Sequence, residues 1–283
     1  NMTLGNELSM NFFVKKADIN NNYDYYIKVT KTYADGREDV VRTFTKDMWT
    51  DYNSTYYSVK FNGVSAKEMT DTVYVQIFYV GGTPASDVWV DSVEQYALRI
   101  LEKQDSYGKT VLVDMLNYGA AAQQEFGYNL SKLANANLSE TQKGYATKST
   151  TATDKRVKGT NYYGSNLTLK SNLMFNIFYQ NITPDMYAII TFTKHTGEAK
   201  NIRVEGSEFV KYNETTYRVP IDEIVVADAR QLVTCNVYNS SGTLIASASD
   251  SVESYIARMS STGAIYDTIM KFADSAYSYF HNR

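Results

Sequence analysis

The feature that most constrains this chain is an internal repeat, because three segments of its first half recur in the same order in its second half. The segment that starts at Asn1, Asn-Met-Thr-Leu-Gly-Asn-Glu-Leu-Ser-Met-Asn-Phe-Phe-Val, matches Asn-Leu-Thr-Leu-Lys-Ser-Asn-Leu-Met-Phe-Asn-Ile-Phe-Tyr from Asn166, with six identities in fourteen positions. The offset then falls only from 165 (166 − 1) to 160 and 159 in the other two matches. A chain of 283 residues is therefore expected to hold two diverged copies of one module. The other two matches start at Tyr52 and Tyr212, and at Asp91 and Asp250.

The first ninety or so residues of each copy alternate between apolar and polar side chains, which is typical of half-buried strands. Turn dipeptides such as Asp35-Gly36 and Asn62-Gly63 separate the runs. Short strands at this spacing predict an antiparallel β-sandwich of immunoglobulin-like arrangement in each copy. The apolar positions of the first copy are Leu8, Met10, Phe12 and Val14, then Tyr25, Ile27 and Val29, then Tyr57, Val59 and Phe61.

The pattern then changes to helical spacing. Asp91 and Asp250 are expected to cap the first helix of each copy, with Glu94 and Glu253 three residues later as an acidic form of the capping box. A second apolar stripe follows in each copy, and Gly127 has the place of a helix-terminating glycine. The predicted fold class is α+β, with two tandem repeats that each consist of a sandwich followed by an α-helical hairpin.

These patterns set the domain boundaries. Repeat 1 is expected over 1–143, with its sandwich over about 1–90 and its helices over about 91–127. Repeat 2 is expected over 161–283, with its sandwich over about 161–249 and its helices over about 250–281. Residues 144–160 have no period and few apolar side chains, so they predict a mobile linker.

Composition limits the partners. The net charge of −3 argues against a nucleic-acid partner, which normally requires a basic face. No apolar run reaches the ~20 residues of a membrane span. The chain has 25 tyrosines among many hydroxyl and amide side chains, a composition typical of sugar-binding faces, although tyrosine is also a good strand former. The single cysteine, Cys235, precludes an intrachain disulfide and fits an exported bacterial protein.

Residues of the usual catalytic kinds are few. His195 is expected in a hairpin turn, His281 near the end of the chain, and Cys235 in a strand as a core thiol. These positions suit neither a nucleophilic triad nor a zinc site, so we expect no enzyme activity, no cofactor and no metal. Asp18 and Asp24 bound a run spaced like the start of a calcium loop, but without the central glycine and the final glutamate. That run predicts a polar hairpin loop.

The repeat provides a control for aromatic side chains, because positions that are aromatic in both copies are most simply required by the fold. Four aromatic residues of the first copy align with non-aromatic or ambiguous positions of the second. A pyranose needs a flat apolar platform beside polar groups. The four aromatic residues are therefore the candidate carbohydrate-binding residues. Two have a structural alternative, since Trp49 could instead plug one end of the sandwich and Trp89 could pack on the helices. The four are Trp49, Tyr56, Tyr26 and Trp89.

The run Asp-Met-Leu-Asn-Tyr-Gly-Ala-Ala-Ala-Gln-Gln-Glu-Phe-Gly-Tyr-Asn over 114–129, preceded by Ala-Lys-Glu-Met-Thr-Asp-Thr over 66–72 and Asp-Ser-Val-Glu-Gln-Tyr over 91–96, is distinctive. It resembles a module that recurs in secreted and cell-surface proteins of anaerobic gut Firmicutes, often beside dockerins. The whole chain also resembles a domain of starch-adherence proteins of amylosomes. These resemblances imply surface attachment, assembly through modules outside this chain, and α-glucan binding.

The function expected from the sequence is therefore non-catalytic carbohydrate binding by a bacterial extracellular or cell-surface protein, with starch or another α-glucan as the favoured partner. The alternative is a structural spacer or protein-interaction stalk without a sugar site. An exposed tryptophan would serve either role.

Overall fold

The chain, described here from a computed structural model, divides into two compact units, Asn1–Tyr145 (unit 1) and Ala146–Arg283 (unit 2). The structure describes residues 2–4, 8–169, 173–259 and 263–282. Positions 1 and 5–7 of the first repeat motif lie outside the described residues, as do 170–172 in the second. The boundary between the two units, after Tyr145, lies close to residue 143, the predicted end of the first repeat.

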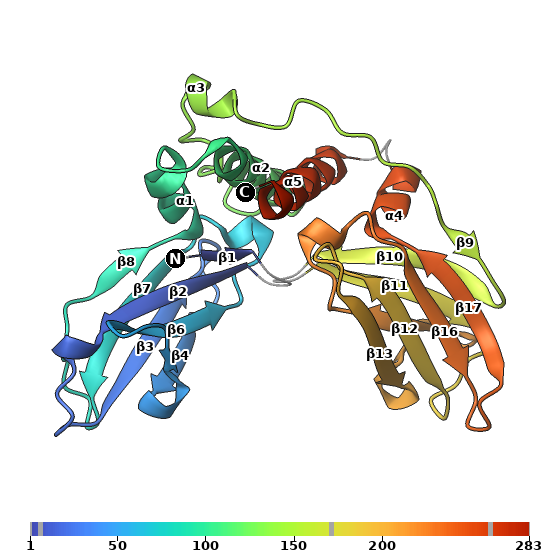
Figure 1. Ribbon diagram of the computed structural model, residues 1–283, viewed down its shortest axis with the longest axis horizontal. Coiled ribbons are helices and arrows are strands. Elements are labelled where there is room, and N and C mark those ends of the chain that lie inside the picture. The colour runs from blue at the N-terminus through green and yellow to red at the C-terminus, as the bar shows by residue number, and fades with distance from the viewer. Residues whose placement is uncertain (1, 5–7, 170–172, 260–262, 283) are drawn as a thin grey trace. The chain divides into compact units, whose positions relative to one another are not determined.

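Unit 1 contains two antiparallel four-stranded sheets, in the orders β1-β2-β6-β5 and β4-β3-β7-β8 (Figure 1). Side chains alternate between the core and solvent along β3 and, from Met10 onward, along β2, as the period of two predicts. The elements are β1 (Met2–Leu4), β2 (Leu8–Lys15), β3 (Tyr25–Thr32), β4 (Val40–Thr45), β5 (Thr50–Asp51), β6 (Tyr56–Asn62), β7 (Thr72–Tyr79) and β8 (Trp89–Asp91), the 3₁₀ turns η1 (Lys16–Asp18), η2 (Lys46–Met48) and η3 (Ala66–Glu68), and the helices α1 (Val93–Leu101), α2 (Ser106–Glu125) and α3 (Glu140–Lys143).

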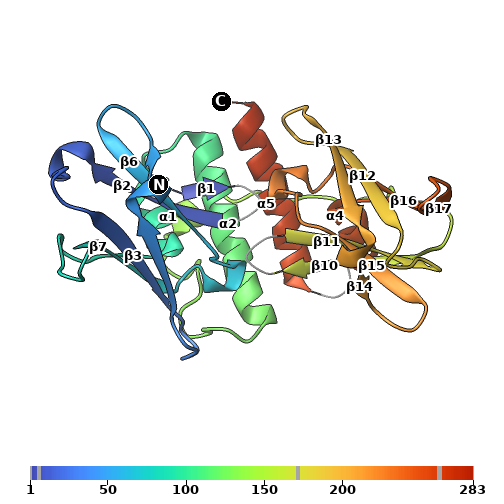
Figure 2. The same cartoon turned by 90° about the horizontal axis from the view of Figure 1, so that it is seen from below.

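Unit 2 also has two antiparallel sheets, in the orders β10-β11-β15-β14 and β13-β12-β16-β17-β9. Figure 2 shows α2 and α5, the long helix of each unit, along most of their length. The elements are β9 (Val157–Lys158), β10 (Tyr162–Leu169), β11 (Leu173–Gln180), β12 (Tyr187–Thr193), β13 (Ala199–Glu205), β14 (Val210–Lys211), β15 (Thr216–Ile221), β16 (Val233–Tyr238) and β17 (Leu244–Asp250), the turns η4 (Gly206–Glu208) and η5 (Val226–Asp228), and the helices α4 (Val252–Met259) and α5 (Ala264–His281).

The fold class is thus α+β, with sandwich-like antiparallel sheets and, in the described residues, five α-helices. The register of β2 on β6 pairs Met10 with Phe61, and the register of β11 on β15 pairs Phe175 with Ile221. These pairs are related by the offsets of 165 (175 − 10) and 160 (221 − 61) that relate the sequence motifs. Apart from β9, which adds a fifth strand to one sheet of unit 2, the two units therefore agree in strand order and, at these strands, in register.

The predicted helix caps are one residue too early. Ser92, not Asp91, caps α1, because its side chain accepts a hydrogen bond from the backbone N–H of Gln95 at 3.0 Å. Ser251 accepts the N–H of Ser254 at 3.0 Å in the same way. The aspartates are instead buried and bind arginines. Gly127 does follow the end of α2 with a φ of 60°, the left-handed conformation expected of a glycine at that place.

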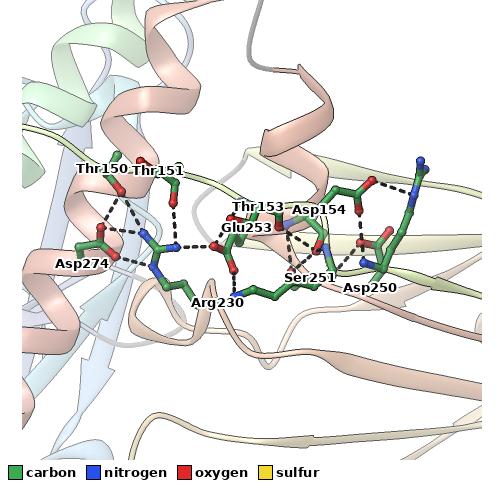
Figure 3. Close-up of polar contacts among 12 residues, drawn as sticks. Thr150, Thr151, Thr153, Asp154, Arg230, Asp250, Ser251, Glu253 and Asp274 are labelled. Atoms are coloured by element: carbon green, nitrogen blue, oxygen red, sulfur yellow. Dashed lines mark hydrogen bonds and ion pairs between the residues drawn. The ribbon is translucent and has the colours of Figure 1, made fainter.

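The segment predicted as a mobile linker is held against unit 2. Arg230 reaches it through the side-chain hydroxyl of Thr150 and the carbonyl of Thr151, both at 3.0 Å. The same guanidinium binds both carboxylate oxygens of Asp274, at 2.7 and 2.9 Å, and one oxygen of Glu253 (Figure 3). The sequence lacked apolar periodicity here because the segment is bound by polar contacts and not by apolar burial.

Candidate functional site

The distinctive run over 114–129 has a structural role that its pattern did not reveal. Gly119 lets α2 approach the segment around η3, since a Cβ there would lie 2.6 Å from the sulfur of Met69. The side chain of Gln123 donates to the hydroxyl of Thr70 at 3.1 Å and accepts the N–H of Ala134 at 2.7 Å. The Tyr128 hydroxyl binds Asp71. These contacts fasten α2 and the loop after it to the sandwich.

Trp49 cannot be the exposed platform that the sequence predicted. Its side chain is buried, with an exposed fraction of 8%, and its indole Nε1 donates to the carbonyl of Phe44 at 3.0 Å. The corresponding turn in unit 2 ends at Phe209, which is also buried. The position is thus aromatic and buried in both units.

Tyr26 also proves to have an aromatic counterpart. It pairs with Phe78 across β3 and β7, and Tyr187 pairs with Tyr238 across β12 and β16. The rings are stacked in both places, with centroids 5.3 and 5.5 Å apart. The strand register thus places Tyr26 opposite Tyr187. By the criterion used for the sequence, Tyr26 is a feature of the fold.

Tyr56 and Trp89 lie on different sheets. Tyr56 is half-buried on β6, where its ring lies edge-on to the ring of Phe13 with the two centroids 6.3 Å apart. Trp89 begins β8, is 43% exposed, and packs edge-on against Phe12 at 5.2 Å. The structure therefore does not assemble the four predicted residues into one surface. Trp89 alone among the four keeps a large exposed indole beside a concave surface.

That concave surface is a cavity of about 470 Å³ in unit 1, which we call the edge groove. It opens between the two sheets, with β2 on one side and β7 and β8 on the other. Its volume lies in the range of small-molecule sites. Asn11, Phe12, Phe13 and Val14 of β2, Ile27 of β3, Val75, Gln76 and Ile77 of β7, Ser86, Asp87 and Trp89, and Tyr96 and Arg99 of α1 line it.

The charged end of the edge groove is an ion pair. Arg99 donates to Asp91 from both terminal nitrogens, at 2.5 and 3.3 Å, and the carboxylate is fully buried. The Asp91 hydrogen bond raises the pKa of Arg99, so the guanidinium remains charged. Sequence reasoning missed this pair. The signal was present, because Asp250 and Arg258 recur in unit 2 at the same spacing and also bind each other, at 2.8 Å.

The histidines and the cysteine lie where the sequence expected them. His195 follows β12, and its Nδ1 lies 2.7 Å from the buried Asp228 carboxylate, a partner that sequence reasoning had not found. The backbone carbonyl oxygen of His195 lies 2.6 Å from Nε2 of His281. Cys235 is fully buried in β16, and burial raises the pKa of its thiol to about 12.

No metal-binding group emerges among the residues that the structure describes, where no three His, Cys, Asp or Glu side chains gather suitably. The loop after η1, over 19–24, is exposed for most of its length and is closed by a hydrogen bond from the N–H of Asn22 to the side chain of Asn20 at 3.0 Å. It is the polar hairpin loop that the sequence predicted. None of the helices within the described ranges combines the length and apolar character needed to cross a membrane.

Comparison with known proteins adds little. No protein-family model matches the chain, and no curated protein does. Among the solved structures that match is a tetra-tandem repeat in the extending region of a large adhesion protein, with 12% identity and a TM-score of 0.21. The match covers 89% of this chain and 47% of that one, so this chain spans about half of its length. A likeness at this TM-score carries no argument about function.

Proposed function

We propose that the chain is a non-catalytic structural module pair, two diverged copies of one immunoglobulin-like sandwich with a helical hairpin, which spaces or joins other parts of a bacterial extracellular or surface protein. The observation that carries this proposal is the agreement of the two units in strand order and register, together with the Asp–Arg pair that each unit repeats. Because both units keep the same core strands and the same internal ion pair, the feature that the two copies share is their shape. The single buried thiol is compatible with export.

The distribution of buried charge supports a structural role. Lys31 is almost fully buried and binds Glu68 at 2.9 Å, which ties β3 to η3. Arg230 joins Glu253 and Asp274, which belong to different helices. A buried charge that loses its partner destabilises a protein by ~3–5 kcal/mol, so the Lys31–Glu68 pair fixes η3 against β3.

The test is electrophoresis of the whole chain through gels that contain starch, xylan or cellulose, together with prolonged incubation with the corresponding oligosaccharides. A structural module should migrate in each gel as it does in a gel without polysaccharide, and the oligosaccharides should remain intact. Retardation by one polysaccharide or release of a specific product would contradict the proposal.

A second candidate function is α-glucan binding in the edge groove, and the exposed indole of Trp89 favours it. The ring lies beside polar groups of Gln76, Asp87 and Arg99, as a sugar platform requires. Trp89→Ala should then abolish retardation in starch gels, while Tyr56→Ala, on the other sheet, should leave it unchanged. If both variants and the wild type migrate alike, the edge groove is no glucan site.

A further inference from the structure

The outward side of the sheet β4-β3-β7-β8 in unit 1, which we call the outer face, is formed by strands that are paired on both sides. β3 lies between β4 and β7, and β7 lies between β3 and β8. The outward sides of β3 and β7 therefore do not depend on any further strand at an edge of the sheet. The side chains of β3 that belong to the core are Tyr25, Ile27, Val29 and Lys31, so those between them belong to the outer face.

A row of side chains crosses the outer face at Thr30. Thr30 of β3 pairs with Val41 of β4 on one side and with Tyr74 of β7 on the other. Val41 is 52% exposed and Tyr74 is 40% exposed. Exposed apolar side chains that lie together and are rimmed by polar groups mark interaction surfaces. The centre of the outer face has this character.

Unit 2 provides a control, because the same row is polar there. The register that relates β3 to β12 places Thr191 at the position of Thr30, and Thr191 pairs with Asn201 on one side and with Thr234 on the other. The hydroxyl of Thr234 lies 2.7 Å from that of Ser249 on the next strand, so the two hydroxyls satisfy each other within the sheet. The fold of a unit therefore does not require apolar side chains in this row, and their presence in unit 1 needs another explanation.

Opposite charges flank the apolar row. Lys28 is exposed on β3, two residues before Thr30. Asp39 is exposed on the other side of the row, where it accepts a hydrogen bond from the hydroxyl of Thr32 at 3.1 Å. A strand rises about 3.3 Å per residue, so Lys28 and Thr32 are about 13 Å apart. The outer face thus has a positive end, an apolar centre and a negative end.

A face with this order of groups is complementary to itself. Two sandwiches can pack through one sheet each with their strands nearly aligned. A two-fold axis that lies in the interface and crosses β3 at right angles near Thr30 reverses the strand direction between the two copies. Lys28 of each copy then faces Asp39 of the other, while Tyr74 faces its own counterpart, as closed two-fold interfaces require.

The outer face also has room for side chains of a second copy. A cavity of about 390 Å³ is hollowed into it, and the residues that line it include Lys28, Thr30, Asp39 and Tyr74. The tyrosine ring of a second copy can enter this cavity and remove its own apolar surface, and that of the cavity wall, from water.

We propose that the outer face of unit 1 binds a second copy of this chain, so that two chains associate through their first units as a two-fold dimer. Charge complementarity identifies the occupant, because a face with one positive and one negative end is matched at both ends by an identical face turned around. The proposal goes beyond the structural role, since it says which face joins two chains and assigns no such contact to the polar row of unit 2.

The test is sedimentation equilibrium of the whole chain from micromolar to millimolar concentration, because a face only four strands wide gives a small interface and a weak dimer. The wild type should pass from monomer to dimer in this range, and added salt should weaken the dimer by screening its charge pairs. Tyr74→Thr, which introduces the residue found in unit 2, should weaken the dimer at least ten-fold, because a two-fold interface counts each substitution twice. The matched control is Thr234→Ala in unit 2, which should leave the association unchanged.

Charge exchange tests the geometry directly. Lys28→Glu alone and Asp39→Lys alone should each keep the chain monomeric, because each variant sets like charges against each other in the dimer. An equal mixture of the two variants should associate as tightly as the wild type, since opposite charges then meet at both ends of the interface. Both side chains are exposed, so circular dichroism should show that each variant remains folded.

The proposal would be overturned by a wild type that stays monomeric at millimolar concentration, by a dimer that Tyr74→Thr leaves unchanged, or by a mixture of the two charge variants that stays monomeric. Any of these results would leave the structural role intact, because that role is tested separately on polysaccharide gels.

Discussion

The hydroxyl of Tyr128 lies 2.8 and 2.6 Å from the two carboxylate oxygens of Asp71. This hydrogen bond joins the loop after α2 to the residues that follow η3. The same carboxylate accepts the N–H of Ala34 at 3.3 Å. Burial raises the pKa of Asp71 to about 6, more than these hydrogen bonds lower it. The contact between helix and sandwich therefore includes a group that titrates in mildly acidic solution.

The first prediction concerns pH. The pKa of Asp71 is higher in the folded than in the unfolded chain, so the folded state binds the extra proton. The contribution of Asp71 to the free energy of unfolding should therefore rise as the pH falls through 6, and be complete below about 3.8. Between pH 7 and pH 5 the gain should be on the order of 1 kcal/mol. Asp71→Asn, a neutral side chain of the same shape, should lack it.

The measurement is calorimetric unfolding of the wild type and Asp71→Asn at several pH values. The difference between the two proteins isolates Asp71 from carboxylates such as Glu68, whose pKa is lowered and whose effect has the opposite sign. A difference that stays constant from pH 7 to pH 5 would show that Asp71 does not titrate there.

The second prediction separates the two tryptophans. Trp49→Ala should lower the free energy of unfolding of unit 1 by ~3–5 kcal/mol, because it removes a buried ring and leaves the Phe44 carbonyl without its donor. Trp89→Ala should cost much less, since the ring is partly exposed. Urea denaturation measures both. Equal costs would mean that Trp49 is not part of the buried core as the structure has it.

The sequence predicted much of the architecture because strand and helix periods are local. The alternation along β2 and β3, the helices α1 and α2 of unit 1 and α4 and α5 of unit 2, and the stop at Gly127 all follow from neighbouring residues. The candidate site was predicted poorly because burial depends on what packs above a residue. Trp49 looked like a loop platform, and only the register of distant strands shows that Tyr26 corresponds to Tyr187.

The third prediction concerns the segment that precedes β9. In the folded chain Lys155 is bound through its side chain to Glu253 at 2.9 Å and through its N–H to Ser254 at 2.8 Å, so trypsin should cleave there slowly. Arg230→Ala removes the neighbouring contacts to Thr150 and Thr151 and should speed cleavage after Lys155 several-fold. Mass spectrometry of timed digests identifies the site.

Arg203→Ala is the control for that experiment. Arg203 forms an exposed pair with Glu205 at 2.5 Å on β13 and should not affect cleavage after Lys155. If Arg230→Ala and the wild type are cut at the same rate, the polar contacts of Arg230 do not hold the segment.

The fourth prediction uses the single thiol. Because burial raises the pKa of Cys235 to about 12, the thiol should react very slowly with an aromatic disulfide reagent at pH 8 in the folded chain. In urea it should react as fast as a free cysteine. Rapid reaction without denaturant would show that β16 opens readily, contrary to its fully buried place between β12 and β17.

The contacts of Arg230 also define which stretch of gene encodes a transferable unit 2. A recombination joint inside 156–160, where the sequence shows no pattern, would separate Arg230 from Thr150 and Thr151, and Glu253 from Lys155. A joint next to Tyr145 would carry all of these partners together. A unit 2 that begins next to Tyr145 therefore keeps the polar stretch before β9 together with the sandwich that follows it.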